Sequence, residues 1–395
     1  MRCLIVSNTD RMVLMFFVPH IKLLTKLGYE VSLAVPKTDT YIHQLKEQLP
    51  DIPIHHIPFT RNLNPVKNMK AYKSLRNLIK KQDFDLIHVH TPIASFLTRM
   101  ITPKGQALIY TAHGFHFHEN GSKINNRIYY LAEKFAAKKT SQLIVINEDD
   151  RTQATSIFPD EKINHIKGVG VDASYFNPEH FSEDDKTKIK QSMGIPEQYQ
   201  VITHVAEFTD NKRQKDIILA AEKMKSLTKE FVILLVGEGP GRDEIKAEIS
   251  KRNLDEHVRC TGFLHNIHEV LSITDIGLLV SLREGLPKSL MEMMSMEIPV
   301  VATDIRGNRD LVTDCEQGYL IPLESPDDIE LSCLQLMQDE NLRKYLGKQG
   351  REKILKEYDL NLILGELQNI YQSFKPPVEN ELNVLKNNKK IKSVL

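Results

Sequence analysis

Two glutamates eight residues apart, Glu284 and Glu292, flank a short segment that follows a strand-like apolar run. Pro287 lies between them and suits the first position of a helix, because its missing N–H would have no partner there. A helix that begins at Pro287 leaves Gly285 and Leu286 with backbone N–H groups where the helix dipole is positive, which favours a phosphate. The spacing predicts a diphosphate held between two hydroxylated groups, the sugar and the ribose of a nucleotide-sugar.

The same spacing argues against hydrolysis of a glycosidic bond by this pair. With Glu292 in the second helical turn, the two carboxylates lie about 10–12 Å apart along the helix axis. A glycosidase pair needs a separation of about 5–10 Å. From spacing alone, an ordinary strand–helix connection with two surface glutamates stays open as the alternative.

The histidines indicate one substrate contact and no metal centre. His113, His116 and His118 are close in sequence, but no cysteine and no helical i, i+4 pair accompanies them, so we expect no metal ion there. We expect His113 to lie near the substrate, because Gly114 beside it allows a close approach to the backbone. His88 and His90 alternate on a strand and are interpreted as structural hydrogen-bonding groups. The Asp-Phe-Asp run at 83–85 is interpreted as a polar loop rather than a cation site.

Composition describes a globular chain that does not bind nucleic acid. The 395 residues contain 52 basic and 52 acidic side chains. Residues 1–180 hold 23 basic against 16 acidic side chains, a net +7, so the remaining 29 and 36 give a net −7. Such an asymmetry indicates that the two halves meet different partners. The longest apolar runs, at 12–18 and 231–236, are far below the ~20 residues that a membrane span needs.

Short apolar runs alternate with helical patterns, which predicts parallel sheets in the α/β class. The predicted strands are 3–7, 31–35, 86–89, 107–111, 142–146, 201–205, 231–236, 258–261, 276–279 and 300–303. Ten strands are too many for one compact domain. The composition changes near Asn177-Pro178, and the run Ser182-Glu-Asp-Asp185 reads as a capped helix start. We therefore expect a first domain over 1–178, a second over 179–358, and a polar, mobile tail over 375–395.

A basic segment in the first domain could meet a membrane. Residues 61–81 contain seven basic side chains and no acidic one, including Arg61, Lys67 and Lys70. An apolar stripe recurs every three or four residues, at Val66, Met69, Tyr72, Leu75 and Ile79, with Leu78 beside the last. Such a helix can lie on an anionic bilayer. A solvated basic face on a helix that packs into the core stays open as the alternative.

The four cysteines lie far apart, with no C-x-x-C pair, and predict reduced structural thiols in a cytoplasmic protein. The glycine-rich run 237–241 lacks the third glycine of a dinucleotide-binding motif, since Arg242 stands there. We interpret it as a strand-to-helix turn that lines a donor cleft.

Several ordered motifs resemble family 4 retaining glycosyltransferases of the GT-B fold, and more closely the enzymes of bacterial capsule and exopolysaccharide biosynthesis. The resemblance covers residues 1 to about 374. It is carried by a Glu, seven residues and a second Glu at 284–292, and by five further runs: Asp85-Leu-Ile-His-Val-His-Thr-Pro92, Thr111-Ala-His-Gly-Phe-His-Phe117, Gly170-Val-Asp172 with Phe176 and Pro178, Gly237-Glu-Gly-Pro-Gly241, and Pro299-Val-Val-Ala-Thr-Asp-Ile-Arg-Gly-Asn308.

The resemblance implies two facing doubly wound, Rossmann-like domains. The N-terminal domain would bind the acceptor, the C-terminal domain would bind the nucleotide-sugar, and a final helix, about 359–374, would cross back. By the same likeness Glu284 contacts the donor sugar, Glu292 the ribose, and Lys212 the diphosphate, while His113 lies near the reacting sugar. The remaining donor contacts expected are Gly285, Leu286, Pro287, Arg213, Gly237 and Phe263; on the acceptor side, Asp10 and Arg11 join the basic segment.

Three positions depart from the family pattern. Glu207 stands where many members have an arginine, so we expect its carboxylate to face away and Arg213 to supply the second positive charge. Glu297 replaces a helix-ending glycine and costs about 1 kcal/mol if its backbone is left-handed. The first loop, 8–11, lacks a common Gly-Gly pair.

The sequence thus predicts a metal-independent retaining hexosyltransferase without a cofactor. It would move a hexose or N-acetylhexosamine from a nucleotide-sugar, UDP above all, to a polyprenyl-diphosphate-linked glycan at the inner face of the cell membrane. Two alternatives stay open: a catalytically silent partner subunit of the same fold, and a nucleotide-sugar epimerase of similar architecture.

Overall fold

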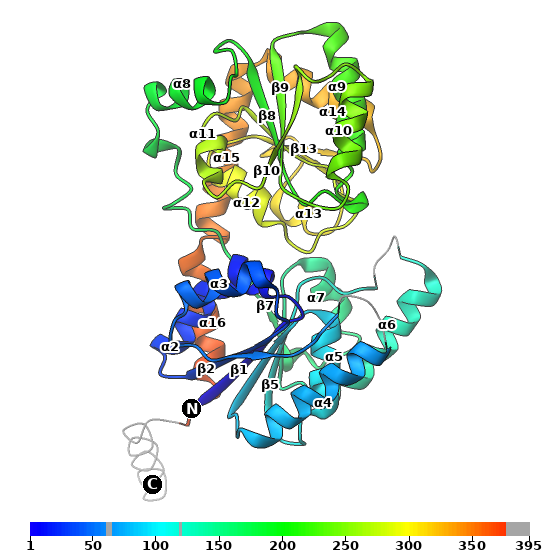
Figure 1. Ribbon diagram of the computed structural model, residues 1–395, viewed down its shortest axis with the longest axis vertical. Coiled ribbons are helices and arrows are strands. Elements are labelled where there is room, and N and C mark those ends of the chain that lie inside the picture. The colour runs from blue at the N-terminus through cyan, green and yellow to red at the C-terminus, as the bar shows by residue number, and fades with distance from the viewer. Residues whose placement is uncertain (61–64, 118–120, 377–395) are drawn as a thin grey trace, which may run out of the picture. The chain divides into compact units, whose positions relative to one another are not determined.

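The computed structural model describes residues 1–60, 65–117 and 121–376, and divides into two compact units (Figure 1). Unit 1 takes in Met1–Ala112, Phe117–Ile144 and the described residues from Leu364. Unit 2 takes in His113–His116 and Val145–Ile363. In the described part of the chain no helix is both long and apolar enough to cross a bilayer.

Two sheets carry the fold, with strand orders β3-β2-β1-β4-β5-β6-β7 and β10-β9-β8-β11-β12-β13. The central strands β1 and β8 are each hydrogen-bonded in parallel to a neighbour on either side. The strands of the first sheet are β1 (Arg2–Val6), β2 (Glu30–Val35), β3 (Ile54–His56), β4 (Leu86–His90), β5 (Ala107–Ala112), β6 (Gln142–Val145) and β7 (Ile163–His165). Those of the second are β8 (Gln200–Val205), β9 (Phe231–Val236), β10 (Val258–Gly262), β11 (Ile276–Leu279), β12 (Val300–Thr303) and β13 (Gly318–Ile321).

Helices connect successive strands, as parallel pairing requires. Up to β8 they are α1 (Asp10–Met12), the π turn η1 (Val13–Phe17), α2 (Val18–Lys26), α3 (Asp39–Gln48), α4 (Pro65–Lys81), α5 (Pro92–Ile101), α6 (Lys123–Ala136), η2 (Ala137–Lys139), α7 (Glu148–Ala154), η3 (Asp160–Lys162), η4 (Pro178–His180) and α8 (Glu183–Ser192). After β8 they are η5 (Asp210–Lys212), α9 (Gln214–Leu227), α10 (Arg242–Lys251), α11 (Ile267–Ser272), α12 (Lys288–Ser295), α13 (Asn308–Leu311), α14 (Pro326–Gln338), α15 (Glu340–Glu357) and α16 (Leu360–Gln372).

All ten predicted strands are present, each with ends within one residue of the prediction, and the α/β class with two doubly wound sheets is confirmed. Three strands escaped prediction: β3, β7 and β13. Each has only three or four residues and lies at the edge of its sheet. An edge strand needs no continuous apolar run, because it does not have to be buried on both faces.

The strands of the second sheet are buried between two helical layers, and β9 shows why its sequence is apolar throughout. Ile233 and Leu235 pack with α9, α10 and α14 in one core cluster. Val232 and Leu234, which alternate with them, pack into a second cluster with α11. Figure 1 shows α9, α10 and α14 together on one side of this sheet. A strand whose two faces are both covered cannot alternate polar and apolar residues.

The predicted helix start at Ser182 is confirmed. The Ser182 hydroxyl accepts from the Asp185 N–H at 3.2 Å, and the Asp185 carboxylate accepts from the Ser182 N–H at 3.0 Å. This reciprocal pair is a capping box, which satisfies two N–H groups that have no partner inside the helix. Glu297 has φ of 58°, so its backbone is left-handed and carries the strain expected of a non-glycine residue there.

The apolar stripe of α4 packs into unit 1. Leu75 and Ile79 are buried, whereas Met69 is 54 % exposed. Val66 and Lys67 belong to the helix, but their side chains, like all of Arg61, lie outside the described residues. Leu75 and Ile79 of the stripe therefore belong to the core, and Lys70 is on the exposed side; contact of this basic face with a membrane stays a prediction.

A buried hydrogen-bond chain fastens α16 to the first sheet. The Tyr371 hydroxyl lies 2.9 Å from Nδ1 of His88, and His88 Nε2 lies 2.8 Å from the hydroxyl of Thr111. The Tyr29 hydroxyl donates to the carbonyl of Tyr371 at 2.8 Å, and burial raises the pKa of Tyr29 to about 12. Both ring nitrogens of His88 are engaged, which confirms the structural interpretation of this histidine.

We predict that Tyr371→Phe destabilises the chain by about 1–3 kcal/mol, because it leaves the buried Nδ1 of His88 without its partner. Thermal unfolding of the purified protein measures the effect. Tyr345→Phe is the matched control, since Tyr345 is 59 % exposed. Equal melting temperatures for the two variants would contradict the structural role of the chain.

Candidate functional site

The second sheet reverses its strand order between β8 and β11. In open α/β sheets, ligands bind beyond the carboxyl ends of the strands at such a reversal. The loop after β8 brings Lys212 there and the loop after β11 brings Glu284. Their side chains form an ion pair that is mostly shielded from solvent, with exposures of 20 % and 12 %. Two predicted catalytic residues, 72 positions apart in sequence, thus meet at the expected edge of the sheet.

Hydrogen bonds hold these two loops together beneath the ion pair. The Leu282 N–H donates to the carbonyl of Asn211 at 2.8 Å. The Asn211 side-chain amide donates to the carbonyl of Arg283 at 3.1 Å. The residues next to Lys212 and Glu284 are therefore fixed before any ligand arrives.

Helix α12 begins one residue later than predicted. Pro287 is its N-cap, with φ of −78° and an extended ψ of 117°, so the first helical residue is Lys288. The prediction that Pro287 is the first helical residue is therefore wrong; an extended ψ keeps it outside the helix. The N–H groups of the first turn still have no carbonyl inside the helix, so they keep their capacity to bind an anion.

Glu292 lies in the second turn of α12, as predicted. Its carboxylate is 3.5 Å from the ammonium of Lys288, one turn earlier. Burial raises the pKa of Glu292 above its ordinary 4.5, and Lys288 opposes that rise. A carboxylate shielded in this way gains more from a hydroxyl donor than one in water does.

The segment around His113 packs directly on the loop that carries Glu284. A Cβ atom added at Gly285 would lie 2.2 Å from the carbonyl oxygen of His113. One added at Gly114, whose φ is 115°, would lie 2.9 Å from Nη2 of Arg306. The close backbone approach requires glycine at position 285, and the positive φ favours glycine at 114, so the His113 backbone lies against the loop that carries Glu284.

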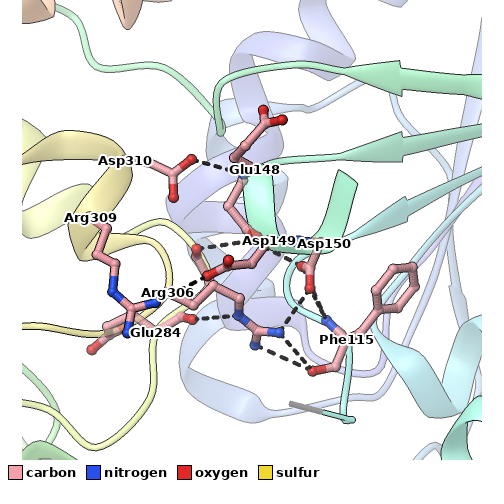
Figure 2. A network of polar contacts seen from close by, with 10 residues as sticks. Phe115, Glu148, Asp149, Asp150, Glu284, Arg306, Arg309 and Asp310 are labelled. Atoms are coloured by element: carbon pink, nitrogen blue, oxygen red, sulfur yellow. Dashed lines mark hydrogen bonds and ion pairs between the residues drawn. The ribbon is translucent and has the colours of Figure 1, made fainter. Parts of the chain in front are cut away.

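A buried arginine that the sequence analysis did not assign ties these segments together (Figure 2). Arg306 follows β12, and its Nη1 lies 2.8 Å from Oδ1 of Asp150. The same guanidinium donates to the carbonyl of Phe115 at 3.3 Å and to that of Glu284 at 3.4 Å. One cation therefore holds the backbone of the His113 segment and that of the Glu284 loop.

Asp150 completes this network from the first turn of α7. Its carboxylate accepts from the Phe115 N–H at 3.2 Å and from the Asn147 amide at 2.9 Å, and that amide also donates to the carbonyl of Gly285 at 3.1 Å. Burial raises the pKa of Asp150, and Arg306 opposes that rise. Asn147 followed by three acidic residues is a pattern from which the start of a helix can be predicted. No pattern in the sequence indicates that Asp150 pairs with Arg306.

Two further predicted donor residues lie on loops at the same edge of the sheet. Gly237 follows β9 with φ of 143°, and a Cβ atom there would lie 2.0 Å from the carbonyl oxygen of Ala206, in the loop after β8. Phe263 follows β10, is 40 % exposed and meets the ring of His265 edge-on. Leu286 is buried; a Cβ atom at Gly168 would lie 2.7 Å from its side chain.

Arg213 is held by carboxylates of its own unit. Its guanidinium donates twice to Asp216, at 2.8 Å for each bond, and lies 3.0 Å from Glu324. This pairing raises the pKa of Arg213. A second charge from Arg213 toward a diphosphate would have to break this arrangement, whereas Lys212 needs only to leave Glu284. The orientation of the Glu207 carboxylate stays a prediction.

The residues that the sequence analysis assigned to the acceptor side, Asp10 and Arg11 among them, lie in unit 1. Asp10 is buried, and its carboxylate accepts from the N–H of Thr38 at 2.9 Å and from the Thr38 hydroxyl. The guanidinium of Arg11 lies 5.9 Å from the ring centre of Tyr41. Thr91, after β4, has φ of 68°, and its hydroxyl accepts from the N–H of Asn8 at 3.2 Å. Asp10 thus ties together the loops after β1 and β2.

The described residues contain no group of three or more His, Cys, Asp or Glu side chains arranged to hold a metal ion; His118 is not among them. Asp85 accepts from the backbone N–H of Arg2 at 2.6 Å. All four cysteines are free thiols, and burial raises the pKa of Cys333 to about 12.

Comparison with known families and proteins places the chain among sugar transferases. The family described as glycosyl transferases group 1 matches residues 185–353, and glycosyltransferase family 4 matches residues 20–173. Putative glycosyltransferase EpsD of Bacillus subtilis (strain 168) is 30 % identical, over 91 % of this chain and 93 % of its own. The Escherichia coli UDP-Gal:alpha-D-GlcNAc-diphosphoundecaprenol alpha-1,3-galactosyltransferase is 28 % identical, over 79 % of this chain and 81 % of its own.

The solved structures that resemble it share the fold at lower identity. Anabaena Alr3699/HepE in complex with UDP and glucose has a TM-score of 0.78 at 17 % identity, covering 94 % of this chain and 100 % of that one. WaaG, a glycosyltransferase involved in lipopolysaccharide biosynthesis, has a TM-score of 0.72 at 15 % identity, covering 94 % and 99 %. WaaG is a glycosyltransferase by name, and the likeness of this chain to both structures supports the GT-B fold.

We predict that Arg306→Met destabilises the chain by about 3–5 kcal/mol, because the Asp150 carboxylate stays buried without its cation. Without Arg306 the pKa of Asp150 rises further, so the folded chain binds the proton more tightly than the unfolded chain does. The loss in the free energy of unfolding, relative to the wild type, is then small at acid pH and grows as the pH rises through that pKa. Urea unfolding at several pH values measures it.

Arg309→Met is the matched control, since the ion pairs of Arg309 with Asp304 at 2.6 Å and with Asp149 at 3.7 Å are partly exposed. Such pairs contribute about 0–1 kcal/mol. Similar losses for the two variants, or a pH-independent loss for Arg306→Met, would contradict the role given to the buried pair.

Proposed function

The chain belongs to glycosyltransferase family 4, and from that membership and the site's geometry we propose that it moves a hexose or N-acetylhexosamine from a UDP-sugar to a lipid-linked saccharide. The proposed transfer retains the anomeric configuration and serves capsule or exopolysaccharide biosynthesis at the inner face of the membrane. The observation that carries it is the Lys212–Glu284 ion pair at the strand-order reversal, beside the N-terminus of α12.

The ion pair prepares both residues for a nucleotide-sugar. A diphosphate carries more negative charge than one carboxylate and so competes for the ammonium of Lys212. Lys212 then turns to the diphosphate, and the carboxylate of Glu284 becomes an acceptor for hydroxyls of the donor sugar. Glu292, one helical turn and a half along α12, accepts from the ribose hydroxyls.

Departure of UDP is the step that needs charge stabilisation. Negative charge builds on the diphosphate as the glycosidic bond breaks, and the Lys212 ammonium with the first-turn N–H dipoles of α12 lies ready to stabilise it. These groups supply the positive charge that a metal ion would otherwise bring, so the proposal needs no metal and no cofactor. His113, held beside Glu284 by the Arg306 network, contacts the reacting sugar.

The lipid-linked acceptor is proposed from the relatives' names. The Escherichia coli relative acts on a diphosphoundecaprenol-linked sugar. A Campylobacter jejuni relative, 25 % identical over 94 % of this chain, is named as an N-acetylgalactosaminyltransferase for a diphospho-undecaprenol substrate. Family membership favours transfer over epimerisation, and labelled sugar that stays in the water-soluble fraction would revive the epimerase. Sugar transfer by the purified chain alone would exclude the alternative of a catalytically silent subunit.

We predict that Glu292→Gln weakens UDP binding by about ten- to hundredfold, the value of hydrogen bonds to a charged acceptor. Glu284→Gln should not weaken UDP binding, because it removes the carboxylate that competes for Lys212, and it should reduce turnover, because the proposed partner of Glu284 is the sugar. Calorimetric titration with UDP and with a panel of UDP-sugars measures both, and Glu340→Gln on the exposed start of α15 is the control. If both variants keep wild-type binding and turnover, the site assignment fails.

UDP affinity should also fall as the pH is lowered through the raised pKa of Glu292. The ligand-free chain holds a proton on this carboxyl at pH values where an ordinary glutamate has lost it, and binding to the ribose releases that proton. UDP itself also takes up a proton as the pH is lowered, so the quantity to compare is the ratio of wild-type to Glu292→Gln affinity across pH. A ratio that does not change with pH would count against Glu292 as the ribose ligand.

A further inference from the structure

Helix α6 presents an apolar stripe to solvent in unit 1. Ile124, Ile128, Leu131 and Phe135 are 74 %, 58 %, 53 % and 64 % exposed. Their spacing of four, three and four residues puts all four side chains on one face of the helix. A contiguous exposed stripe of large apolar residues marks a surface that binds something, whereas a single exposed one does not.

The charged side chains exposed on α6 are all positive. Lys123, Arg127 and Lys134 are exposed on the same helix, and Lys138 follows just after it. The one acidic residue of α6, Glu133, points inward. The exposed surface of α6 therefore combines apolar side chains with cations and carries no carboxylate.

The inward carboxylate fixes which face of α6 is outside. Glu133 Oε2 lies 2.8 Å from Nη2 of Arg99, a fully buried residue of α5, and Glu133 Oε1 accepts from the Tyr110 hydroxyl at 3.3 Å. The Arg99 guanidinium also lies 4.3 Å from the centre of the Tyr110 ring. Rotating α6 to bury its stripe would break this buried ion pair, so the stripe stays exposed.

The neighbouring helices add positive charge. Helix α5 packs against α4 on one side and α6 on the other, and Figure 1 shows the three helices side by side. The exposed residues of α4 include Lys70, Lys73, Arg76 and Lys80. This helical layer attracts an anionic surface over more than one helix.

We propose that the exposed face of α6 docks on an anionic lipid bilayer, with the stripe in the acyl boundary and the four cations among the headgroups. The inference rests on the proposed function and deepens it, because it names the surface that brings the chain to a lipid-linked acceptor. Binding in such an interface grows with buried apolar area and with attraction to anionic lipid, and α6 offers both. A second copy fits poorly, since pairing the stripes would bring like charges together.

Flotation with lipid vesicles tests the proposal on the full chain. The vesicles contain phosphatidylcholine alone or with an equal part of phosphatidylglycerol. We expect the wild type to float with the anionic vesicles, and the double variant L131Q/F135Q to bind them at least about tenfold less. The matched control is L227Q/L331Q, which removes two side chains exposed to 66 % and 64 % in unit 2. Arg127→Glu should weaken binding, more at low salt than at high salt.

Each outcome decides. Flotation of L131Q/F135Q equal to wild type, or wild-type binding that ignores phosphatidylglycerol, overturns the proposal, as does a wild-type dimer that L131Q/F135Q alone converts to monomers in light scattering. UDP titration of the same samples separates this result from the proposed function. A variant that loses vesicle binding and keeps UDP affinity supports the docking face. If the wild type does not bind UDP, the proposed function is wrong, and the flotation result still tests the docking face.

Discussion

The candidate site depends on the buried ion pair between Arg306 and Asp150. Removing two charges from water is expensive, and their attraction offsets that cost only when the remaining donors and acceptors are also satisfied. Here the guanidinium also donates to the carbonyls of Phe115 and Glu284, while the carboxylate also accepts from Phe115 N–H and the Asn147 amide. The hydrogen bonds that offset the cost of burying this ion pair also position the His113 segment and the Glu284 loop.

A second constraint is the close approach of two backbones at Gly114 and Gly285. A Cβ atom at Gly285 would lie 2.2 Å from the carbonyl of His113, so any side chain there would push the segments apart. Backbone contact therefore brings the His113 segment and the Glu284 loop together without side-chain bulk between them. Loops held in this way suit a transferase, because the backbone around the site is fixed and only the Lys212 side chain has to turn from Glu284 to the diphosphate.

In unit 1, two of the polar residues that the sequence singled out form hydrogen bonds inside the unit. Asp10 and His88 are engaged by their own unit, Asp10 through Thr38 and His88 through Tyr371 and Thr111. Its outward features are the basic side of α4 and the apolar and basic face of α6. The net positive charge of the first 180 residues thus gathers, in part, on helices that also expose apolar side chains, the combination that a charged lipid surface binds.

The sequence by itself determined the strands that are buried on both faces, such as 231–236, the helix start at Ser182, and the residue types at 284–292, because these follow from local patterns of burial, capping and backbone geometry. It could not determine that Lys212 pairs with Glu284, or that Arg306 reaches Asp150 across 156 positions, because no local pattern records which loops the sheet order brings together. The sequence also could not determine which apolar stripes are buried. Helices α4 and α6 both carry an apolar stripe at helical spacing, yet Leu75 is buried and Leu131 is exposed. The periodicity of a helix says that it has two faces. Which of them meets the sheet is decided by the packing of the whole unit, here by the buried pair of Arg99 and Glu133.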